Sequence, residues 1–130
     1  MAKKNTFDKF LNIQTIKKKN GACRIKLTLK DILLNYGGIA HGGVIASICD
    51  IVLAGAVESV LKKDQWCVTA ELNVHFLNPA PPKSVLYGYA KIVKVGKTLA
   101  FVEGGIETID KKQIAKATGI WAIKNLRVKT

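Results

Sequence analysis

Cysteine is scarce in this chain of 130 residues, and its spacing is typical of no metal site. Cys23, Cys49 and Cys67 are an odd number, so they cannot all pair as disulfides within one chain. Two of them lie in apolar stretches, which favours reduced, packed thiols. No zinc-ligand cluster appears, and the first twelve residues hold no apolar run of a secretory signal. We therefore expect a cytoplasmic protein without a bound metal.

A serine-hydrolase motif and a membrane-spanning segment are also missing. The sequence has no Gly-x-Ser-x-Gly elbow, which argues against a serine hydrolase. The apolar run from Gly42 to Val57 is too short to cross a bilayer and carries a charge near its middle, so we predict no membrane partner. No repeat, low-complexity segment or linker divides the chain, and its length fits one domain covering residues 1–130.

Acidic residues are outnumbered, with 9 Asp and Glu against 21 Lys and Arg, for a net charge of +12. The lysines cluster at predicted termini and turns, where they can simply solubilise the surface. Only two of the basic residues are arginines, and no basic stripe is interleaved with aromatic residues, so we predict no nucleic-acid partner. The remaining interpretation is attraction of a phosphorylated small molecule.

The hydrophobic pattern predicts the order of the elements. Two alternating runs, 13–19 and 22–30, flank Asn20-Gly21, which is a strong hairpin signal. Helices are expected at 3–11 and 43–61, and further strands at 68–76, 84–95, 98–109 and 113–124. This order favours an α+β fold with a curved antiparallel sheet wrapped around one long central helix.

Two finer expectations concern the ends and faces of these elements. Lys62 and Lys63 should end the long helix by placing positive charge at its negative pole. In the strand 68–76, alternation places one set of side chains on each face. The first set is Val68, Ala70, Leu72, Val74 and Phe76, and the opposite set is Thr69, Glu71, Asn73 and His75. We assign no function to His75.

Asp50 is the only charge between Gly42 and Val57. Because this helix is apolar around its circumference, we expect it to be buried on all sides. A buried carboxylate is costly unless it is paired or hydrogen-bonded, so Asp50 is either a structural acid held by a lysine or by its own helix, or a chemical group. The glycine-rich, donor-rich segment from Asn35 to Gly43 lies directly before it, which favours a chemical site.

A set of motifs now resembles a known family. The matching residues are Asn35, His41-Gly42-Gly43, Asp50, Thr69-x-Glu71-x-Asn73, Asn78-Pro79-Ala80 and Gly96-Lys97-Thr98-Leu99-Ala100-Phe101. This pattern resembles the hotdog-fold acyl-CoA thioesterases, and within them the phenylacetate-degradation (PaaI-like) type. The resemblance extends from about Asn35 to Ile123, and the expected order of elements agrees with that fold.

The resemblance implies hydrolysis of an acyl-CoA thioester to a carboxylic acid and coenzyme A. In that chemistry the backbone N–H of Gly42 would bind the thioester carbonyl, because a glycine at a helix N-terminus presents a free donor. His41 would hold the loop or bond near the sulfur, and Asn35 would orient the carbonyl or the water. Asp50 would be the general base or the nucleophile, with Thr69 bonded to it or to the water.

Coenzyme A is then part of the substrate, and no separate cofactor is expected. Gly43 is a further substrate-binding candidate, although it and Gly42 could serve only close helix packing. Lys83, Lys97 and Arg127 are candidates for contacts to the phosphates of coenzyme A.

The spacing of Gly42 and Asp50 has a geometric consequence. Asp50 follows Gly42 by eight residues (50 − 42 = 8), or about 12 Å along a helix. One chain therefore cannot bring both to the same carbonyl, whereas two antiparallel helices related by a two-fold axis can. We predict a homodimer with two composite sites. The resemblance also implies a homotetramer.

Three other functions stay open. A non-catalytic acyl-CoA binding module would keep the pocket, but it would not need the costly Asp50. A dehydratase of the same fold would need an Asp–His pair poised on one substrate, and Asp50 with His41 does not match that family's motif. A nucleic-acid binder would rest on the charge alone.

Overall fold

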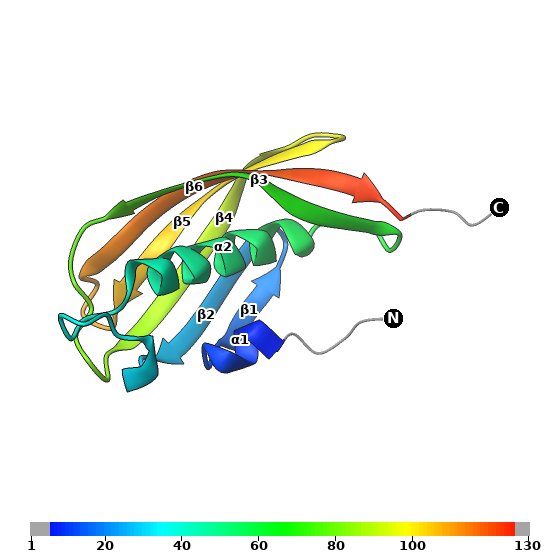
Figure 1. Cartoon of the computed structure of the whole chain (residues 1–130). Coiled ribbons are helices and arrows are strands. Elements are labelled where there is room, and N and C mark those ends of the chain that lie inside the picture. Colours follow the sequence, from blue (N-terminus) through cyan, green and yellow to red (C-terminus); the bar gives the residue numbers. More distant parts are fainter. Residues whose placement is uncertain (1–5, 127–130) are drawn as a thin grey trace.

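The computed structural model describes residues 6–126, which form one antiparallel sheet and one long helix (Figure 1). The helices are α1 (Thr6–Phe10) and α2 (Gly42–Glu58), with a 3-10 turn η1 (Asp31–Leu33). The strands are β1 (Gln14–Lys19), β2 (Ala22–Thr28), β3 (Gln65–Phe76), β4 (Val85–Val95), β5 (Leu99–Thr108) and β6 (Gln113–Asn125).

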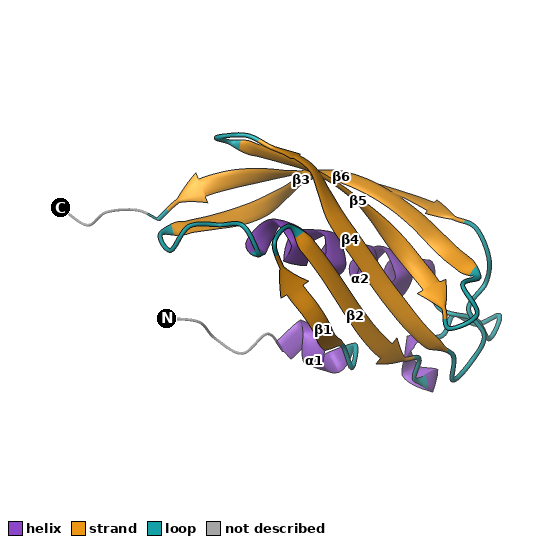
Figure 2. Ribbon diagram, turned by 180° about the vertical axis from the view of Figure 1, so that it is seen from behind, coloured by secondary structure: helices purple, strands orange, loops and turns teal. Residues whose placement is uncertain are grey.

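The sheet has six strands in the order β1-β2-β4-β5-β6-β3, so β1 and β3 are its edges. Every neighbouring pair is antiparallel. The sheet curves around α2, which crosses its concave side, and the opposite face carries no helix in the described part of the chain (Figure 2). The predicted α+β class and the curved sheet around a central helix are confirmed.

The core lies between α2 and the concave face of the sheet. On the helix, Ile48, Val52 and Leu53 are fully buried, and α2 contacts each of the central strands β2, β4, β5 and β6. The helix comes very close to β2 at Gly55, where an added Cβ would lie 2.5 Å from the sulfur of Cys23. This close approach leaves no room for a larger residue at position 55 and fixes the depth of α2 in the sheet.

The Asn20-Gly21 hairpin is confirmed, and its backbone explains the sequence. Asn20 has φ 55° and Gly21 has φ 81°, the left-handed pair that a two-residue hairpin turn requires. The short N-terminal helix expected at 3–11 is present at Thr6–Phe10, and its first residues lie outside the described part. The other strands begin and end within a few residues of their predicted positions.

The long helix ends earlier than its sequence suggests. It stops at Glu58, so Lys62 and Lys63 lie beyond its last turn, and the expectation that they end it was wrong. Ser59 caps the helix instead: its backbone N–H donates to Gly55 O, and its hydroxyl donates to Ala56 O at 2.7 Å. The same hydroxyl accepts the Gly21 N–H at 2.8 Å, which ties the end of α2 to the β1–β2 turn.

A β-bulge in β3 overturns the predicted faces of that strand. The pairing with β6 shifts between Thr69 and Glu71, which leaves Ala70 as an extra residue. Before the bulge, Thr69 faces α2, and after it Leu72 and Val74 face α2. Val68, expected on the core face, is instead 43% exposed on the outer face. One extra residue thus brings Thr69 to the helix without turning the apolar residues that follow it away from the core.

Candidate functional site

Asp50 and Thr69 form a hydrogen-bonded pair between α2 and the edge strand β3. The hydroxyl of Thr69 donates to Oδ1 of Asp50 at 2.7 Å. The pair exists because the bulge at Ala70 turns Thr69 toward the helix. A threonine hydroxyl bound to one carboxylate oxygen fixes the rotamer of the acid and leaves its second oxygen for another partner.

Asp50 is half-buried, and α2 is not buried on all sides, so that expectation was wrong for a single chain. The sheet covers only one side of the helix. The residues on the uncovered side recur at helical spacing and are half-exposed: Val44, Ser47, Asp50, Ile51 and Ala54. We call this row the open face of α2. The carboxylate of Asp50 therefore lies where a second molecule can reach it.

The first turn of α2 presents one unused backbone donor. His41 is the N-cap residue, and its Nδ1 accepts the N–H of Gly43 at 2.9 Å. In this arrangement Nδ1 is an acceptor, which leaves Nε2 as the ring nitrogen that can donate. Within residues 6–126, no hydrogen bond uses the N–H of Gly42, which is exposed. Gly42, rather than Gly43, is thus the free donor at the helix N-terminus.

Asn35 shapes the loop that precedes the helix. Its Oδ1 accepts the N–H groups of Gly37 at 2.9 Å and Ile39 at 3.3 Å, so only the side-chain NH₂ group remains as a donor. Asn35 and Gly42 line the same cavity, of about 480 Å³. The remaining walls are mostly apolar: Ile39, Ala40, Ile45, Phe76, Leu77, Asn78, Pro79, Ala80 and Ile114. A cavity of this kind can hold an acyl group beside the Gly42 donor.

The structure does not bring the two halves of the candidate site together in one chain. Gly42 and Asn35 lie at the N-terminal end of α2, and Asp50 lies about 12 Å further along the helix. Two groups on one straight helix keep that separation. A single chain therefore presents an acid–threonine pair at one place and a carbonyl-binding donor with an apolar cavity at another.

Lys83 and Lys97, two of the candidates for phosphate contacts, also lie far apart in a single chain. Lys83 lies at the start of β4, where its N–H donates to Leu29 O, at the end of the sheet that holds the Asn35 loop. Lys97 lies in the turn after β4, so the two lysines are on the order of 30 Å apart. Arg127 lies outside the described residues.

Lysines gather at the end of the molecule where α2 terminates. Several turns meet at this end. The β1–β2 turn contacts Ser59 at the end of α2. The end of β6 contacts the segment before β3 through Leu126 N–H to Asp64 O, and the β4–β5 turn through Ile123 N–H to Thr98 O. The exposed lysines at this basic end are Lys17, Lys18, Lys19, Lys62, Lys63, Lys97 and Lys124. Glu58 pairs with Lys18 and leaves the others to attract an anion.

The cysteines are free thiols, and burial disfavours the reactive thiolate at Cys49 and Cys67. Burial, together with the charge of Asp50, raises the pKa of Cys49 to about 12. Burial, with smaller effects of nearby charges, raises the pKa of Cys67 to about 11. Both thiols stay protonated at neutral pH, whereas the thiolate is the reactive form. Within residues 6–126, no group of three or more His, Cys, Asp and Glu side chains could hold a metal ion.

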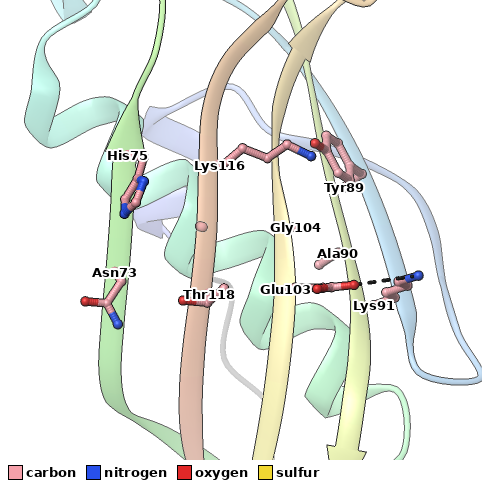
Figure 3. A pocket seen from close by; sticks show the side chains of 10 residues that line it. Asn73, His75, Tyr89, Ala90, Lys91, Glu103, Gly104, Lys116 and Thr118 are labelled. Atoms are coloured by element: carbon pink, nitrogen blue, oxygen red, sulfur yellow. Dashed lines mark ion pairs between the residues drawn. The ribbon is translucent and has the colours of Figure 1, made fainter.

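A second hollow, which the sequence did not indicate, lies on the face of the sheet turned away from α2 (Figure 3). We call it the outer groove; its volume is about 600 Å³. It is lined by Asn73, His75, Tyr89, Ala90, Lys91, Glu103, Gly104, Lys116, Ala117 and Thr118. These residues come from four strands that are far apart in sequence, so only the strand register brings them together. The sheet separates the outer groove from Asp50.

The part of the chain that the structure describes contains no helix that is both long and apolar enough to cross a bilayer.

Comparison with known proteins agrees with this geometry. A family model described as the thioesterase superfamily matches residues 37–115. A protein of Saccharolobus solfataricus, described provisionally as an esterase, is 32% identical over 121 residues, which are 92% of this chain and 84% of that protein.

Solved structures with the same fold include two that are described provisionally as thioesterases. One, related to phenylacetic acid degradation and from Ralstonia eutropha, has a TM-score of 0.86 at 27% identity and covers 93% of this chain and 92% of its own. Another, from Streptococcus pneumoniae and solved with coenzyme A, has a TM-score of 0.83 at 24% identity and covers 92% and 94%. The resemblance seen in the sequence motifs is confirmed at the level of the family.

Proposed function

This chain belongs to the thioesterase superfamily, and on that basis we propose that it hydrolyses acyl-CoA thioesters to a carboxylic acid and coenzyme A. The observation that carries the proposal is the Thr69–Asp50 hydrogen bond, on a helix whose first residue, Gly42, has an unused N–H. Thioester hydrolysis needs these two parts: a positioned carboxylate and a donor for the carbonyl oxygen.

The site is proposed to form between two chains. The open face of α2 consists of small and apolar residues around Asp50, and a second helix packed on it would cover them. β3, an edge strand of twelve residues beside that face, is available for pairing. A two-fold axis between antiparallel α2 helices places Asp50 and Thr69 of one protomer near Gly42 and Asn35 of the other. A homotetramer built from two such dimers is the proposed full assembly.

In this site the carbonyl oxygen accepts hydrogen bonds from the N–H of Gly42 and from the NH₂ of Asn35. As a general base, Asp50 takes a proton from water while the oxygen of that water bonds to the carbonyl carbon. The C–S bond then breaks, the thiolate of coenzyme A leaves and takes up a proton, and the acid is released. As a nucleophile, Asp50 would instead bond to the carbonyl carbon itself and form an anhydride that water later opens.

A single turnover in H₂¹⁸O distinguishes the two roles. A general base places the ¹⁸O only in the released acid. If Asp50 is the nucleophile, water opens the anhydride, and attack at the side-chain carbonyl carbon of Asp50 leaves the ¹⁸O in its carboxylate. Mass spectrometry of the peptide containing Asp50 detects this label.

Coenzyme A is the proposed leaving group, because the basic end would attract its phosphates. In the proposed dimer, Lys97 of one protomer approaches the Asn35 loop and Lys83 of the other. The Streptococcus pneumoniae structure with coenzyme A supports the same class of ligand. The reaction as written uses no cofactor or metal beyond the substrate itself, and the free thiols are compatible with the cytoplasm.

The test is a panel of acyl-CoAs, both aliphatic and aromatic, with release of free thiol as the readout. We expect turnover of at least one class by the wild-type protein and loss of that turnover in Asp50→Asn. Binding of acyl-CoA without thiol release by the wild-type protein would overturn the proposal and favour a non-catalytic binding module.

A further inference from the structure

We propose that the outer groove is a second, non-catalytic ligand site, and that it takes a small molecule in which an anionic group is joined to a planar ring. The groove lies on the face of the sheet opposite α2, so a ligand there does not touch Asp50 or Gly42 (Figure 3). The inference is therefore independent of the thioester chemistry.

Two neighbouring rows of residues bound the groove, and each row crosses four strands. The strand register aligns the first row across β4, β5, β6 and β3: Tyr89, Gly105, Lys116 and His75. The second row, two residues along each strand, is Lys91, Glu103, Thr118 and Asn73. The side chains therefore stand around a floor formed by Ala90, Gly104 and Ala117.

Gly105 is the gap in the first row. A Cβ at this position would lie 2.4 Å from the carbonyl oxygen of Ala115 and 2.9 Å from the hydroxyl oxygen of Tyr89. The position therefore excludes a side chain, and the ring of Tyr89 lies over the glycine. The result is a flat aromatic surface at the side of the hollow.

A hydrogen-bond network holds Tyr89 in place. Its hydroxyl donates to Oε1 of Gln113 at 2.6 Å, and Nε2 of Gln113 donates to Oε1 of Glu107 at 3.0 Å. Glu107 is only 8% exposed, and it is paired with Arg24 at 3.4 Å and Lys111 at 3.2 Å. A ring tied to a buried, charge-paired carboxylate is preorganised, so a ligand that stacks on it does not have to order it.

The charges of the groove favour an anion. Lys91 is neutralised by Glu103, with 3.6 Å between Nζ and Oε2. Lys116 has no carboxylate partner among the ion pairs of residues 6–126, and its Nζ lies 5.5 Å from the centre of the Tyr89 ring. His75 and Asn73 lie across the hollow on β3 (Figure 3). An anionic group would bind the ammonium of Lys116 while a ring attached to it stacks on Tyr89.

Four ring compounds of similar size test this inference: benzoate, phenyl phosphate, neutral benzamide and cationic benzylamine. The measurement is a titration of the full chain followed by the amide signals of β4, β5 and β6 in two-dimensional NMR. We expect saturable shifts of Gly104, Gly105 and Lys116 with benzoate or phenyl phosphate, and affinities at least about tenfold weaker for benzamide and benzylamine. Comparing the two anions tells whether the site prefers a carboxylate or a phosphate.

Lys116→Met and the control Lys94→Met separate this site from general attraction to a basic protein. Lys94 is also exposed, on β4, but does not line the groove. We expect Lys116→Met to weaken anion binding about tenfold and Lys94→Met to change it less than twofold. Tyr89→Leu should also weaken binding, in a protein whose spectrum shows that it remains folded. Thioesterase turnover should be the same in Lys116→Met as in the wild type.

Three results would overturn the inference. The first is no saturable shift at these amides with either anion, as would follow if another copy of the chain covered the groove. The second is shifts confined to the Asn35–Gly42 loop. The third is equal affinity for the anion in Lys116→Met and Lys94→Met.

Discussion

Thr69 donates its hydroxyl proton to one oxygen of Asp50, and this single bond ties an edge strand to the central helix. The bond orients the acid, while the second oxygen of the carboxylate keeps its lone pairs for water or for the thioester. The two side chains should therefore contribute to catalysis by different amounts.

Asp50→Asn removes the carboxylate but keeps its volume. We expect the turnover number to fall at least about 100-fold, which is the usual loss when a general base is removed. Thr69→Val leaves the carboxylate but removes its hydrogen bond, so kcat should fall about tenfold with little change in KM. Thr15→Val, at an exposed threonine of β1, is the matched control. Unchanged kcat in Asp50→Asn would remove Asp50 from the mechanism.

The lowered pKa of Glu107 leads to a second prediction, which concerns the stability of the fold at acidic pH. Burial pushes the pKa of Glu107 upward, but hydrogen bonds from Lys111, Gln113 and Arg24 and the charge of Lys111 outweigh it and hold the pKa below its usual value of 4.5. A lowered pKa in the folded state stabilises the fold above pH 4.5, and this contribution is lost as the pH falls through the folded-state pKa.

The melting temperature of the wild type should therefore fall more steeply below pH 4.5 than that of Glu107→Gln, because the amide does not titrate. At pH 7 the variant should melt at a lower temperature, since its amide cannot form the ion pairs. The measurement is the melting temperature at steps between pH 3 and 7. Parallel curves for the two proteins would show that Glu107 does not contribute in this way.

Among the elements, β3 depends most on a single residue, the extra Ala70 of its bulge. Deleting Ala70 would restore strict alternation. Thr69 would then stand two positions before Leu72, so Thr69, Leu72 and Val74 would all still face the helix, but the local bend and twist that the bulge adds beside Thr69 would be lost. We expect little change in the free energy of unfolding, because no apolar side chain leaves the core, and a fall in turnover of about tenfold as the Thr69–Asp50 hydrogen bond is misaligned.

Urea denaturation and thiol release measure these two effects, and Ala70→Val serves as the control because it keeps the residue count. A deletion variant with wild-type turnover would contradict the role given to the bulge.

The sequence predicted the elements well because alternation and turn residues are local signals. These signals were enough to predict the hairpin at Asn20-Gly21 and the order of the strands along the chain. The bulge was missed because Val68, Ala70 and Leu72 read as one uninterrupted alternation, and a small extra residue leaves no mark in such a pattern. The burial of Asp50 was overestimated for a related reason: hydrophobicity shows that α2 is apolar all round, but not which side the sheet covers.

The candidate site was predictable only in part. Its residues were identified by a family motif that lies mostly in one loop and one helix. The outer groove carries no such motif, because Tyr89, Gly105, Lys116 and His75 become neighbours only through the pairing of four strands. Their residue types are ordinary for a sheet surface, so no local signal distinguishes them.

For the whole molecule, the proposed sharing of sites between protomers can be tested by mixing two inactive variants. One is Asp50→Asn and the other is Gly42→Pro, which lacks the backbone N–H. In a composite arrangement, a mixed dimer has one site with both lesions and one intact site. Random mixing makes half of the dimers mixed, so about a quarter of wild-type turnover should return.

Sites contained within one chain would each carry one lesion, and the mixture would stay inactive. Native mass spectrometry must first establish that mixed dimers have formed. Inactive mixed dimers would then contradict the composite site.

The uneven placement of the lysines has a consequence for the electric field of the molecule. With positive charge gathered where α2 ends, a single chain has a dipole moment along the helix. In the proposed dimer the two helices point in opposite directions, so these moments cancel and a quadrupole remains, positive at both poles. An anion approaching such a pair is drawn equally to either pole, and neither of the two sites has an electrostatic advantage in capturing the first substrate.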